Sequence, residues 1–340
     1  LPSGDPISAT THGLTSDQFL HPVVLGIRDV QVALGIEGDR PWIGELPQRS
    51  ASAPHHLGLE ADRILAGESV VIYMNKASTR TRLASETAVA HLGGTPIFVR
   101  GDELQIGRGE TIADTARIIS NFAKAFIIRT FAQEDVAEFA KWATVPVINA
   151  LTDEDHPTQL LADWVTIREI FGKNISNRKF TYLGDGNNMA NAWMLIGARL
   201  GAHVTIATPP GKWAPNTAVV DRARKIAAEH GGSIEILHDP VAAARDASVL
   251  YTDVWMSMGD AESERAEKLA ALSPFAVTSN LMALTNKDSI FMHCLPAHRG
   301  EEVSAEVLDG PKSVIWREAF HRRTTIQAVL YHLVRGELKG

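Results

Sequence analysis

From residue 69 onward, short apolar runs alternate with longer segments in which apolar residues recur at helical spacing. The first four runs are SVVIYM (69–74), TPIFVR (95–100), AFIIRT (125–130) and VPVINA (145–150). Runs of this length, separated by segments of helical periodicity, are typical of buried strands that alternate with helices. The first half of the chain is therefore predicted to form βαβ units around a parallel sheet.

The second half repeats this pattern after a longer helical segment. HPTQLLADWVTIREIF (156–171) has a broad apolar face, and we expect it to connect two domains. Further strands are predicted at 180–185, 203–208, 233–237, 248–254, 289–295 and, briefly, 313–316, before a terminal helix over 317–335. The simplest architecture is of the α/β class, with two doubly wound parallel-sheet domains joined by helices. We place these domains at 1–155 and 156–316.

The N-terminal part of the chain has a different pattern. Residues 1–14 are predicted to be a loose leader without the basic and apolar regions of a signal peptide. Thr15 and Gln18 have the spacing of a capping box, which predicts an amphipathic helix to about Leu34. The Gly-, Pro-, Ser- and His-rich segment 36–58 is predicted to be a long loop.

Composition narrows the class of protein. The 340 residues are 45% hydrophobic and 21% charged, enough for two ordinary cores. A formal net charge of −7 argues against a nucleic-acid partner. No apolar run approaches the ~20 residues of a membrane span. The single cysteine, Cys294, excludes an intramolecular disulfide or a cysteine-based zinc site, and we expect a reducing compartment such as the cytoplasm.

Polar residues follow the first strand at the point where a helix is predicted to begin. Ser78, Thr79, Arg80 and Thr81 bring hydroxyl and guanidinium groups to that helix start. Free backbone N–H groups and the positive end of the helix dipole would make this a phosphate site. A capped helix start with a solvated arginine pair explains the same residues equally well, so both interpretations stay open.

Two later strands of the same half also end in polar residues. Arg129 ends the apolar run 125–130, where a buried guanidinium needs an anion from the protein or from a ligand. His156 and Gln159 lie one helical turn apart just after the run 145–150. Because parallel strands present their carboxyl ends at one edge, we expect these side chains to face a common ligand site.

The second half shows the same arrangement. The segment GDGNN has Gly184 and Gly186 but not the third glycine of a dinucleotide-binding turn. This argues against a nicotinamide oxidoreductase. Asn188 and Asp253 follow two of the strands and suit the head group of an amino acid. Cys294 lies at a strand tip, and a buried thiol is expected there rather than a covalent nucleophile, because its neighbour His293 faces the opposite side of the strand.

Six motifs, in order, resemble the ornithine branch of the aspartate/ornithine carbamoyltransferase family from about residue 65 to the C-terminus. They are STRTR (78–82), QIGRGE (105–110), HPTQ (156–159), GDGNN (184–188), DVWMSMG (253–259) and HCLPAHRGEEV (293–303). The resemblance implies transfer of a carbamoyl group from carbamoyl phosphate to the side-chain amine of ornithine, in arginine metabolism. It requires no metal or other cofactor. It also implies that the helix within 317–340 packs back on a carbamoyl phosphate domain.

The resemblance assigns roles to residues on both substrates. The carbamoyl phosphate set is Ser78, Thr79, Arg80, Thr81, Gln105, Arg129, His156, Gln159, Cys294, Leu295 and Arg322. The ornithine set is Asn188, Asp253, Ser257 and Met258. Arg80, Arg129, His156 and Cys294 would lie closest to the reacting atoms. Gln159 and the Leu295 carbonyl would hold the carbamoyl NH₂ group.

The resemblance also implies an assembly and leaves two alternatives. Gln105 would reach the phosphate of a neighbouring subunit, in a homotrimer or stacked trimers with shared active sites. The sequence departs from the family pattern at Asn75, Phe320 and His321. A different amine acceptor, such as putrescine, acetylornithine or a specialised diamino acid, is therefore the first alternative. A catalytically silent paralogue that binds the same ligands is the second.

Overall fold

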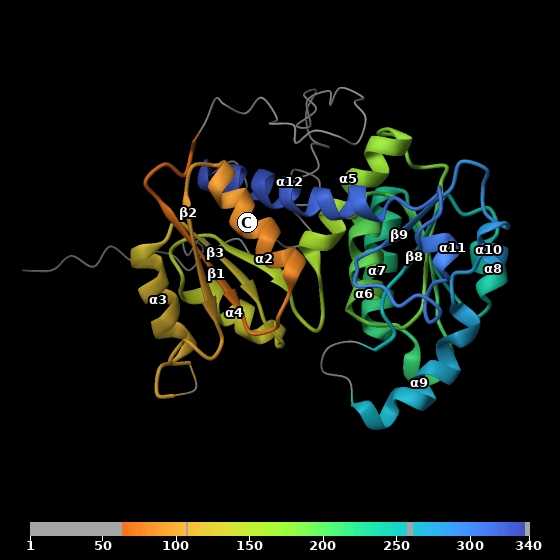
Figure 1. The fold of residues 1–340 in the computed structure, drawn as a ribbon, viewed down its shortest axis with the longest axis horizontal. Helices are drawn as coiled ribbons and strands as arrows, with labels where there is room; N and C mark the ends of the chain where they lie inside the picture. The colour runs from red at the N-terminus through yellow and green to blue at the C-terminus, as the bar shows by residue number, and fades with distance from the viewer. Residues whose placement is uncertain (1–62, 107, 257–260, 337–340) are drawn as a thin grey trace, which may run out of the picture.

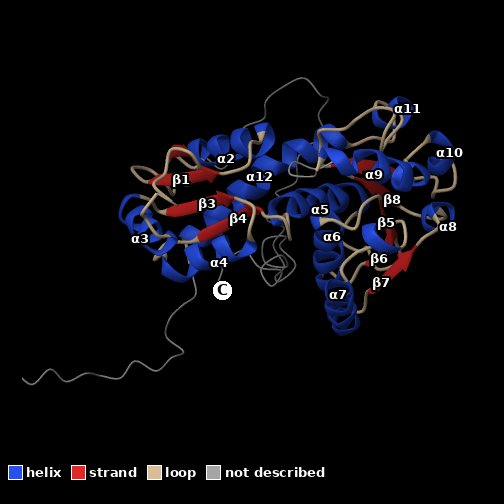
Figure 2. Ribbon diagram, turned by 90° about the horizontal axis from the view of Figure 1, so that it is seen from below, coloured by secondary structure: helices blue, strands red, loops and turns tan. Residues whose placement is uncertain are grey.

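The computed structural model describes residues 63–106, 108–256 and 261–336. The helix expected between Thr15 and Leu34 and the long loop 36–58 lie outside these residues. Nine parallel strands in two sheets make up the sheet structure of the described residues (Figures 1 and 2). The prediction of two parallel-sheet α/β units is therefore confirmed.

The first sheet has the strand order β2-β1-β3-β4. Its strands are β1 (Ser69–Met74), β2 (Thr95–Arg100), β3 (Ala125–Arg129) and β4 (Val147–Leu151). The helices that connect them are α2 (Thr79–His91), α3 (Ile112–Phe122) and α4 (Gln133–Trp142). Successive residues of β1 point to opposite faces. Val70 and Ile72 pack in the core with α2, whereas Val71 and Tyr73 pack in the core with α3 and α4.

The second sheet has the strand order β7-β6-β5-β8-β9. Its strands are β5 (Lys179–Leu183), β6 (His203–Ala207), β7 (Ser233–Leu237), β8 (Val249–Thr252) and β9 (Ile290–His293). One face packs against α6 (Asn188–Arg199) and α7 (Thr217–His230). The other packs against short helices: α8 (Pro240–Ala244), α10 (Ser279–Met282) and α11 (Ala305–Leu308). A further helix, α9 (Arg265–Leu272), lies near the edge of this half in Figure 1.

Two long helices join the halves. They are α5 (Pro157–Phe171), where helix 156–171 was predicted, and the terminal α12 (Ile315–Val334). The apolar face of α12, with Ile326, Val329 and Leu330, is buried in the core cluster that also contains residues of α2 and α5. In Figure 1 both helices run along one side of the molecule between the two sheets. The division between residues 155 and 156 stays a prediction.

The predicted strand at 313–316 is wrong. Only Ser313 forms a bridge, with Phe291 of β9, and α12 begins at Ile315. Ile315 is buried and the next residue, Trp316, is exposed, a change that the sequence pattern cannot distinguish from strand alternation over so few residues. The short helices α8 to α11 were not predicted, because four to eight residues carry too few apolar repeats to show a helical period. Among the described helices, none has the length and apolar character needed to cross a membrane.

Candidate active site

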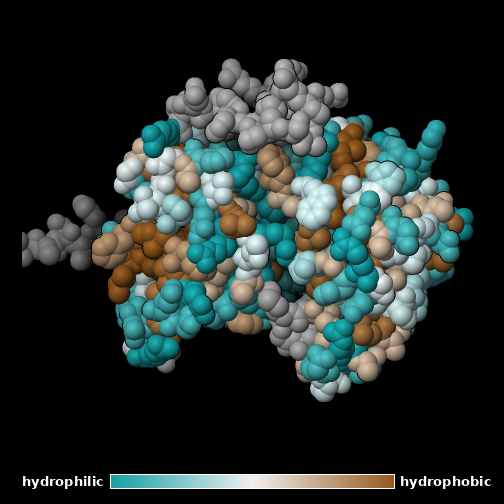
Figure 3. All heavy atoms as spheres, viewed as in Figure 1, coloured by the Kyte–Doolittle hydropathy of each residue, from teal (hydrophilic) through white to brown (hydrophobic). Residues whose placement is uncertain are grey.

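A cavity of about 890 Å³ lies where the carboxyl ends of the strands of both sheets face each other. Figure 3 shows the molecule hollowed between its two halves. Residues that follow β1, β3 and β4 line one side, residues that follow β5, β8 and β9 line the other, and α12 contributes one residue. The lining includes Ser78, Thr79, Arg80, Arg129, His156, Asn188, Asp253, Cys294, Leu295 and Arg322. Most of the residues singled out from the sequence are thus brought together around one cavity.

The start of α2 forms one wall of this cavity. Ser78 is the N-cap residue: its hydroxyl oxygen accepts a hydrogen bond from the backbone N–H of Thr81 at 3.2 Å. Arg80 lines the cavity, whereas Arg82 points away, forms an ion pair with Glu86 at 3.0 Å and stacks on a phenylalanine ring. Arg80 therefore fits the phosphate-site interpretation, whereas Arg82 is a solvated arginine. The helix turn directs the first inward and the second to solvent.

Two buried guanidinium groups lie next to Arg80. Arg129 and Arg322 both donate to the hydroxyl of Thr81, at 3.4 and 3.2 Å. The Nε atom of each has no hydrogen-bond partner, and neither forms an ion pair with a carboxylate in the described part of the chain. Burial, and then the neighbouring arginines, lower the pKa of Arg129 to about 10. Three cations that form no ion pair with any described carboxylate make a site suited to a polyanion.

His156 lies at the start of α5, beside the same arginines. Its side chain is buried, and its Nδ1 atom has no partner within the described residues. Burial lowers the pKa of His156 well below its ordinary value, and the charges of Arg322, Arg129 and Arg80 lower it further. The imidazole is therefore neutral and can donate a hydrogen bond to a ligand without adding a charge.

Gln159, Thr81 and Gln105 do not line the cavity. Gln159 is buried behind the lining: its amide nitrogen donates to the carboxyls of Asp163 and Glu318, and its amide oxygen accepts from Arg322. Gln105 is exposed after β2. The roles that the resemblance implies for Gln159, Thr81 and Gln105 stay predictions. Ser257 and Met258, predicted to contact ornithine, lie outside the described residues.

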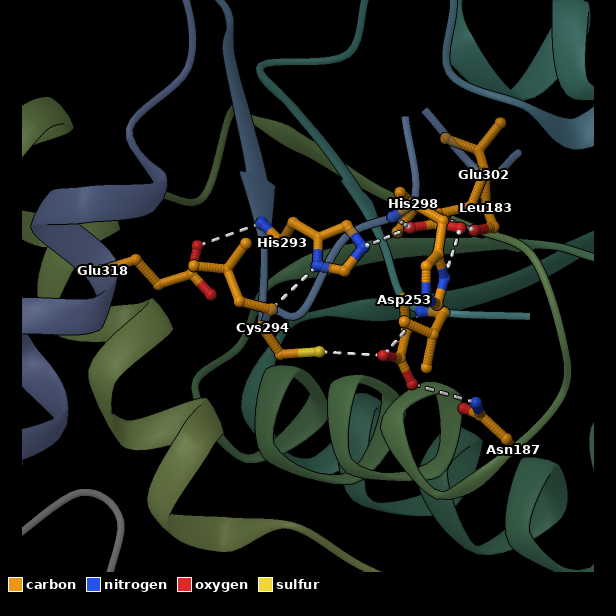
Figure 4. Close-up of polar contacts among 11 residues, drawn as sticks. Leu183, Asn187, Asp253, His293, Cys294, His298, Glu302 and Glu318 are labelled. Carbon is orange, nitrogen blue, oxygen red and sulfur yellow. Dashed lines mark hydrogen bonds and ion pairs between the residues drawn. The ribbon is translucent and has the colours of Figure 1, made fainter. Parts of the chain in front are cut away.

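The opposite wall centres on Asp253, at the end of β8. Its carboxylate accepts hydrogen bonds from the thiol of Cys294 at 2.9 Å and from the side-chain amide of Asn187 at 3.1 Å (Figure 4). Burial and the Asp253 charge raise the pKa of the Cys294 thiol well above its ordinary value. The thiol is therefore protonated, which disfavours a covalent role. His293 faces away and contacts Glu302 at 3.3 Å, in keeping with the strand alternation.

The GDGNN turn shapes the wall between these residues. Asn187 caps α6 through its side-chain oxygen, and Asn188 donates to the Thr152 carbonyl at 2.9 Å while lining the cavity. Gly186 is required by close packing, because a Cβ atom there would lie 2.4 Å from the backbone nitrogen of Pro215.

We therefore expect Gly186→Ala to destabilise the protein by about 1–3 kcal/mol, the usual cost of overpacking against atoms that cannot move away. Thermal unfolding of the variant would measure this loss. Backbone strain does not add to this loss, because Gly186 is not among the glycines with a positive φ. Gly211→Ala is the comparison variant, in which strain acts without a clash, since its φ is +79° and no atom lies within 4 Å of its Cβ position. A Gly186→Ala variant as stable as the wild type would contradict the packing.

Several lining residues were missed from the sequence. Lys76 is buried, forms an ion pair with Asp153 and lies 4.4 Å from the centre of the Phe131 ring. Asp185 also lines the cavity and pairs with Lys268 at 2.7 Å. Lys76 and Asp185 follow β1 and β5 closely, so the rule that ligands bind at the carboxyl ends of parallel strands could have found both.

Comparison with known proteins agrees with this geometry. The carbamoyl-P binding domain model of aspartate/ornithine carbamoyltransferases matches residues 45–169, and the Asp/Orn binding domain model matches residues 176–333. The ornithine carbamoyltransferase of Pyrococcus horikoshii is 49% identical over 82% of this chain and 87% of its own length. That of Symbiobacterium thermophilum is 48% identical over 79% and 86%.

Solved structures give the same result. The ornithine carbamoyltransferase of Pyrococcus furiosus superimposes with a TM-score of 0.77 at 49% identity, over 82% of this chain and 88% of that one. The anabolic enzyme of Campylobacter jejuni superimposes with a TM-score of 0.76 at 37% identity, over 82% and 91%. The chain belongs to the aspartate/ornithine carbamoyltransferase family.

Proposed function

We propose that this chain transfers the carbamoyl group of carbamoyl phosphate to the side-chain amine of L-ornithine, giving L-citrulline and phosphate. The observation that carries the proposal is the polarity of the cavity. Arg80, Arg129 and Arg322 lie on one side, and the carboxylate of Asp253 lies on the other. A dianionic phosphate and the ammonium group of an amino acid are the complementary ligands.

Carbamoyl phosphate would bind on the arginine side. The hydroxyls of Ser78 and Thr79, the N-terminal amides of α2 and the guanidinium of Arg80 would hold the phosphate. Arg129 and neutral His156 would contact the carbonyl oxygen. The Leu295 carbonyl would accept from the carbamoyl NH₂ group, and Arg322 would bind from α12. Gln159, whose amide oxygen accepts from Arg322, would contact the same NH₂ group.

Ornithine would bind on the Asp253 side. Asp253 and Asn188 would hold its α-ammonium and α-carboxylate groups, with Ser257 and Met258 completing the pocket. The side-chain amine would then reach the carbamoyl carbon beside Cys294. Because the Cys294 thiol donates to Asp253, it would orient that carboxylate without reacting itself.

The reaction proceeds by direct attack. The lone pair of the neutral δ-amine forms a bond to the carbamoyl carbon, and the carbon–oxygen bond to phosphate breaks with its electron pair on phosphate. The amine proton leaves to the phosphate dianion or to solvent. Negative charge that develops on the carbonyl oxygen is stabilised by Arg129 and His156, the same principle as an oxyanion hole. Holding both substrates between two domains supplies proximity.

The depressed pKa of His156 gives a test of its neutral role. We expect the ring resonances of His156 to stay unchanged between about pH 8 and about pH 5.5, a range in which an ordinary histidine, with a pKa near ~6.5, titrates. NMR of labelled protein would measure this, with His156→Gln identifying the signal. Titration of His156 with an ordinary midpoint would remove the neutral donor from the mechanism.

Ornithine is favoured over another amine by the position of the sequence departures. Asn75, Phe320 and His321 do not line the cavity. His321 is buried against Glu169 at 2.7 Å, and Phe320 is partly exposed on α12. These departures therefore leave the acceptor pocket unchanged among the described residues.

The decisive assay is carbamoyl product formation with ornithine, putrescine, acetylornithine and lysine as acceptors. We expect turnover with ornithine and little with the others. Binding of carbamoyl phosphate without product from any amine would instead favour the silent paralogue. If another amine were turned over faster than ornithine, that amine would be the substrate instead.

We further propose a cytoplasmic homotrimer, alone or stacked, in which Gln105 reaches the phosphate of a neighbouring subunit. Exposed apolar side chains on β2 and α3, namely Ile97, Ile118 and Phe122, support an interface on this half of the molecule. Figure 3 shows an apolar patch on the same half. The proposed boundary between the carbamoyl phosphate domain and the amino-acid domain is residue 155. Light scattering of the purified chain would measure the assembly.

A further inference from the structure

Two carboxyl groups lie directly behind the arginine side of the cavity. Asp163 on α5 and Glu318 on α12 are almost completely buried, with 0% and 1% of their surface exposed, and neither lines the cavity. The amide nitrogen of Gln159 donates to both, at 2.7 Å to Asp163 Oδ1 and 2.8 Å to Glu318 Oε1. A single nitrogen atom therefore holds the two carboxyls next to each other.

Their surroundings offer one full positive charge. The groups that face the pair are Arg322 on α12, the Tyr251 phenol on β8, and the His293 backbone N–H and Cys294 thiol at the end of β9. Glu318 Oε2 accepts from that N–H at 3.0 Å (Figure 4). Among these groups only Arg322 carries a charge, so two ionised carboxylates would leave one negative charge uncompensated in the interior.

One oxygen of the pair is open to a proton. Asp163 Oδ2 is buried and has no partner at ordinary hydrogen-bond geometry among the described residues, and the Glu318 carboxyl and the Tyr251 phenol are the groups close enough to bond to the Asp163 carboxyl. Both oxygens of Glu318 and Oδ1 of Asp163 accept hydrogen bonds. Burial raises the pKa of both carboxyls, and the charge of Asp163 raises that of Glu318 further. Adjacent carboxyls in such surroundings titrate as a pair that keeps one proton.

We propose that Asp163 and Glu318 are positioning residues that share a single proton and thereby hold the charge behind Arg322 at −1. This inference rests on the proposed function, in which the cavity side of Arg322 binds carbamoyl phosphate. The shared negative charge balances Arg322 when the site is empty. Through Gln159, whose oxygen accepts from Arg322, the pair also fixes the direction of the guanidinium.

The proposal makes ligand affinity depend on pH in a defined direction. When the pair loses its proton at alkaline pH, the charge behind Arg322 becomes −2 and opposes a phosphate dianion. Asp163→Asn replaces the protonated acid with an amide of the same shape, so the charge behind Arg322 cannot go beyond −1 at alkaline pH. The variant should therefore lack the alkaline loss of affinity that the wild type shows.

Calorimetric titration with carbamoyl phosphate, in the absence of any amine, tests this directly. Between about pH 6 and about pH 9, we expect wild-type affinity to fall by about tenfold relative to Asp163→Asn, as one extra buried charge near a guanidinium would cause. The titration of the ligand itself cancels in this ratio. Asp309→Asn, the same change at an exposed aspartate paired with Arg299, should follow the wild type. A constant ratio across this range would overturn the proposal.

Infrared spectroscopy gives a second measurement that does not depend on the variant's affinity. The difference between the wild-type and Asp163→Asn spectra at neutral pH should show the carbonyl band of a buried protonated carboxyl, which disappears at alkaline pH. A band from Asp155, whose pKa is also raised to about 7 by burial, cancels in this difference. Absence of the band from this difference would overturn the shared proton. If the wild type failed to bind carbamoyl phosphate at all, the proposed function would fall, and the infrared band would still test the pair.

Discussion

Arg80→Ala should lower kcat/KM for carbamoyl phosphate by about 10²–10³-fold, the usual effect of removing one preorganised group that stabilises developing charge. The Arg80 side chain lines the cavity next to Arg129 and Arg322. Neither of those two guanidinium groups forms an ion pair with a described carboxylate. Its removal takes away one of three charges that would face the phosphate. Steady-state kinetics with saturating ornithine, and calorimetry with carbamoyl phosphate alone, would measure the loss.

The adjacent helix turn supplies the matched control. Arg82→Ala removes the same side chain two residues away, where 48% of it is exposed and it pairs with Glu86. Such a surface pair contributes only about 0.3–0.5 kcal/mol, so we expect nearly normal kinetics. Equal losses in the two variants would mean that the helix start, and not the inward guanidinium, is what matters.

Asp253→Asn should raise KM for ornithine by about a hundredfold, corresponding to about 2.7 kcal/mol, with little change in the affinity for carbamoyl phosphate. The amide keeps the shape of the carboxylate and loses the charge that would pair with the α-ammonium group. The amide is also a poorer hydrogen-bond acceptor than the carboxylate, to which both the Cys294 thiol and the Asn187 amide donate.

Asp185→Asn is the control for this second prediction. Asp185 lines the same cavity, but its charge is paired with Lys268 at 2.7 Å. We expect a small effect on KM for ornithine. Separate calorimetric titrations of the Asp253→Asn variant with carbamoyl phosphate and with norvaline would show whether the loss is confined to the amino acid. Equal weakening of both ligands would count against Asp253 as the ammonium partner.

The sequence predicted the strands well because each is a short apolar run, and most of them, such as β1 and β3, are buried along nearly their whole length. The runs at 69–74 and 233–237 coincide with β1 and β7. The error at 313–316 arose because Ile315 starts a helix whose first turn looks like an alternating strand. The short helices of the second half could not be predicted for a related reason: with at most eight residues, none of them is long enough to show a helical period clearly.

The candidate site was predictable where a residue directly follows a strand. Arg129, Asp253 and Cys294 lie at the ends of β3, β8 and β9 and line the cavity as that rule implies. The rule could not predict which way a helical side chain points, which is why Arg80 and Arg82 could not be told apart. Nor could it show that Gln159 lies behind the lining, because its partners Asp163 and Glu318 are distant in the sequence from each other.

The central claim is that one cavity binds a phosphate compound on its arginine side and an amino acid on its Asp253 side. A crystal structure with carbamoyl phosphate and norvaline, an ornithine mimic that lacks the reacting amine, tests it most directly. We predict the phosphate against Ser78 and Arg80, the carbonyl oxygen against Arg129 and His156, and the norvaline ammonium group against Asp253. Phosphate bound elsewhere, or norvaline with its ammonium group away from Asp253, would contradict the account.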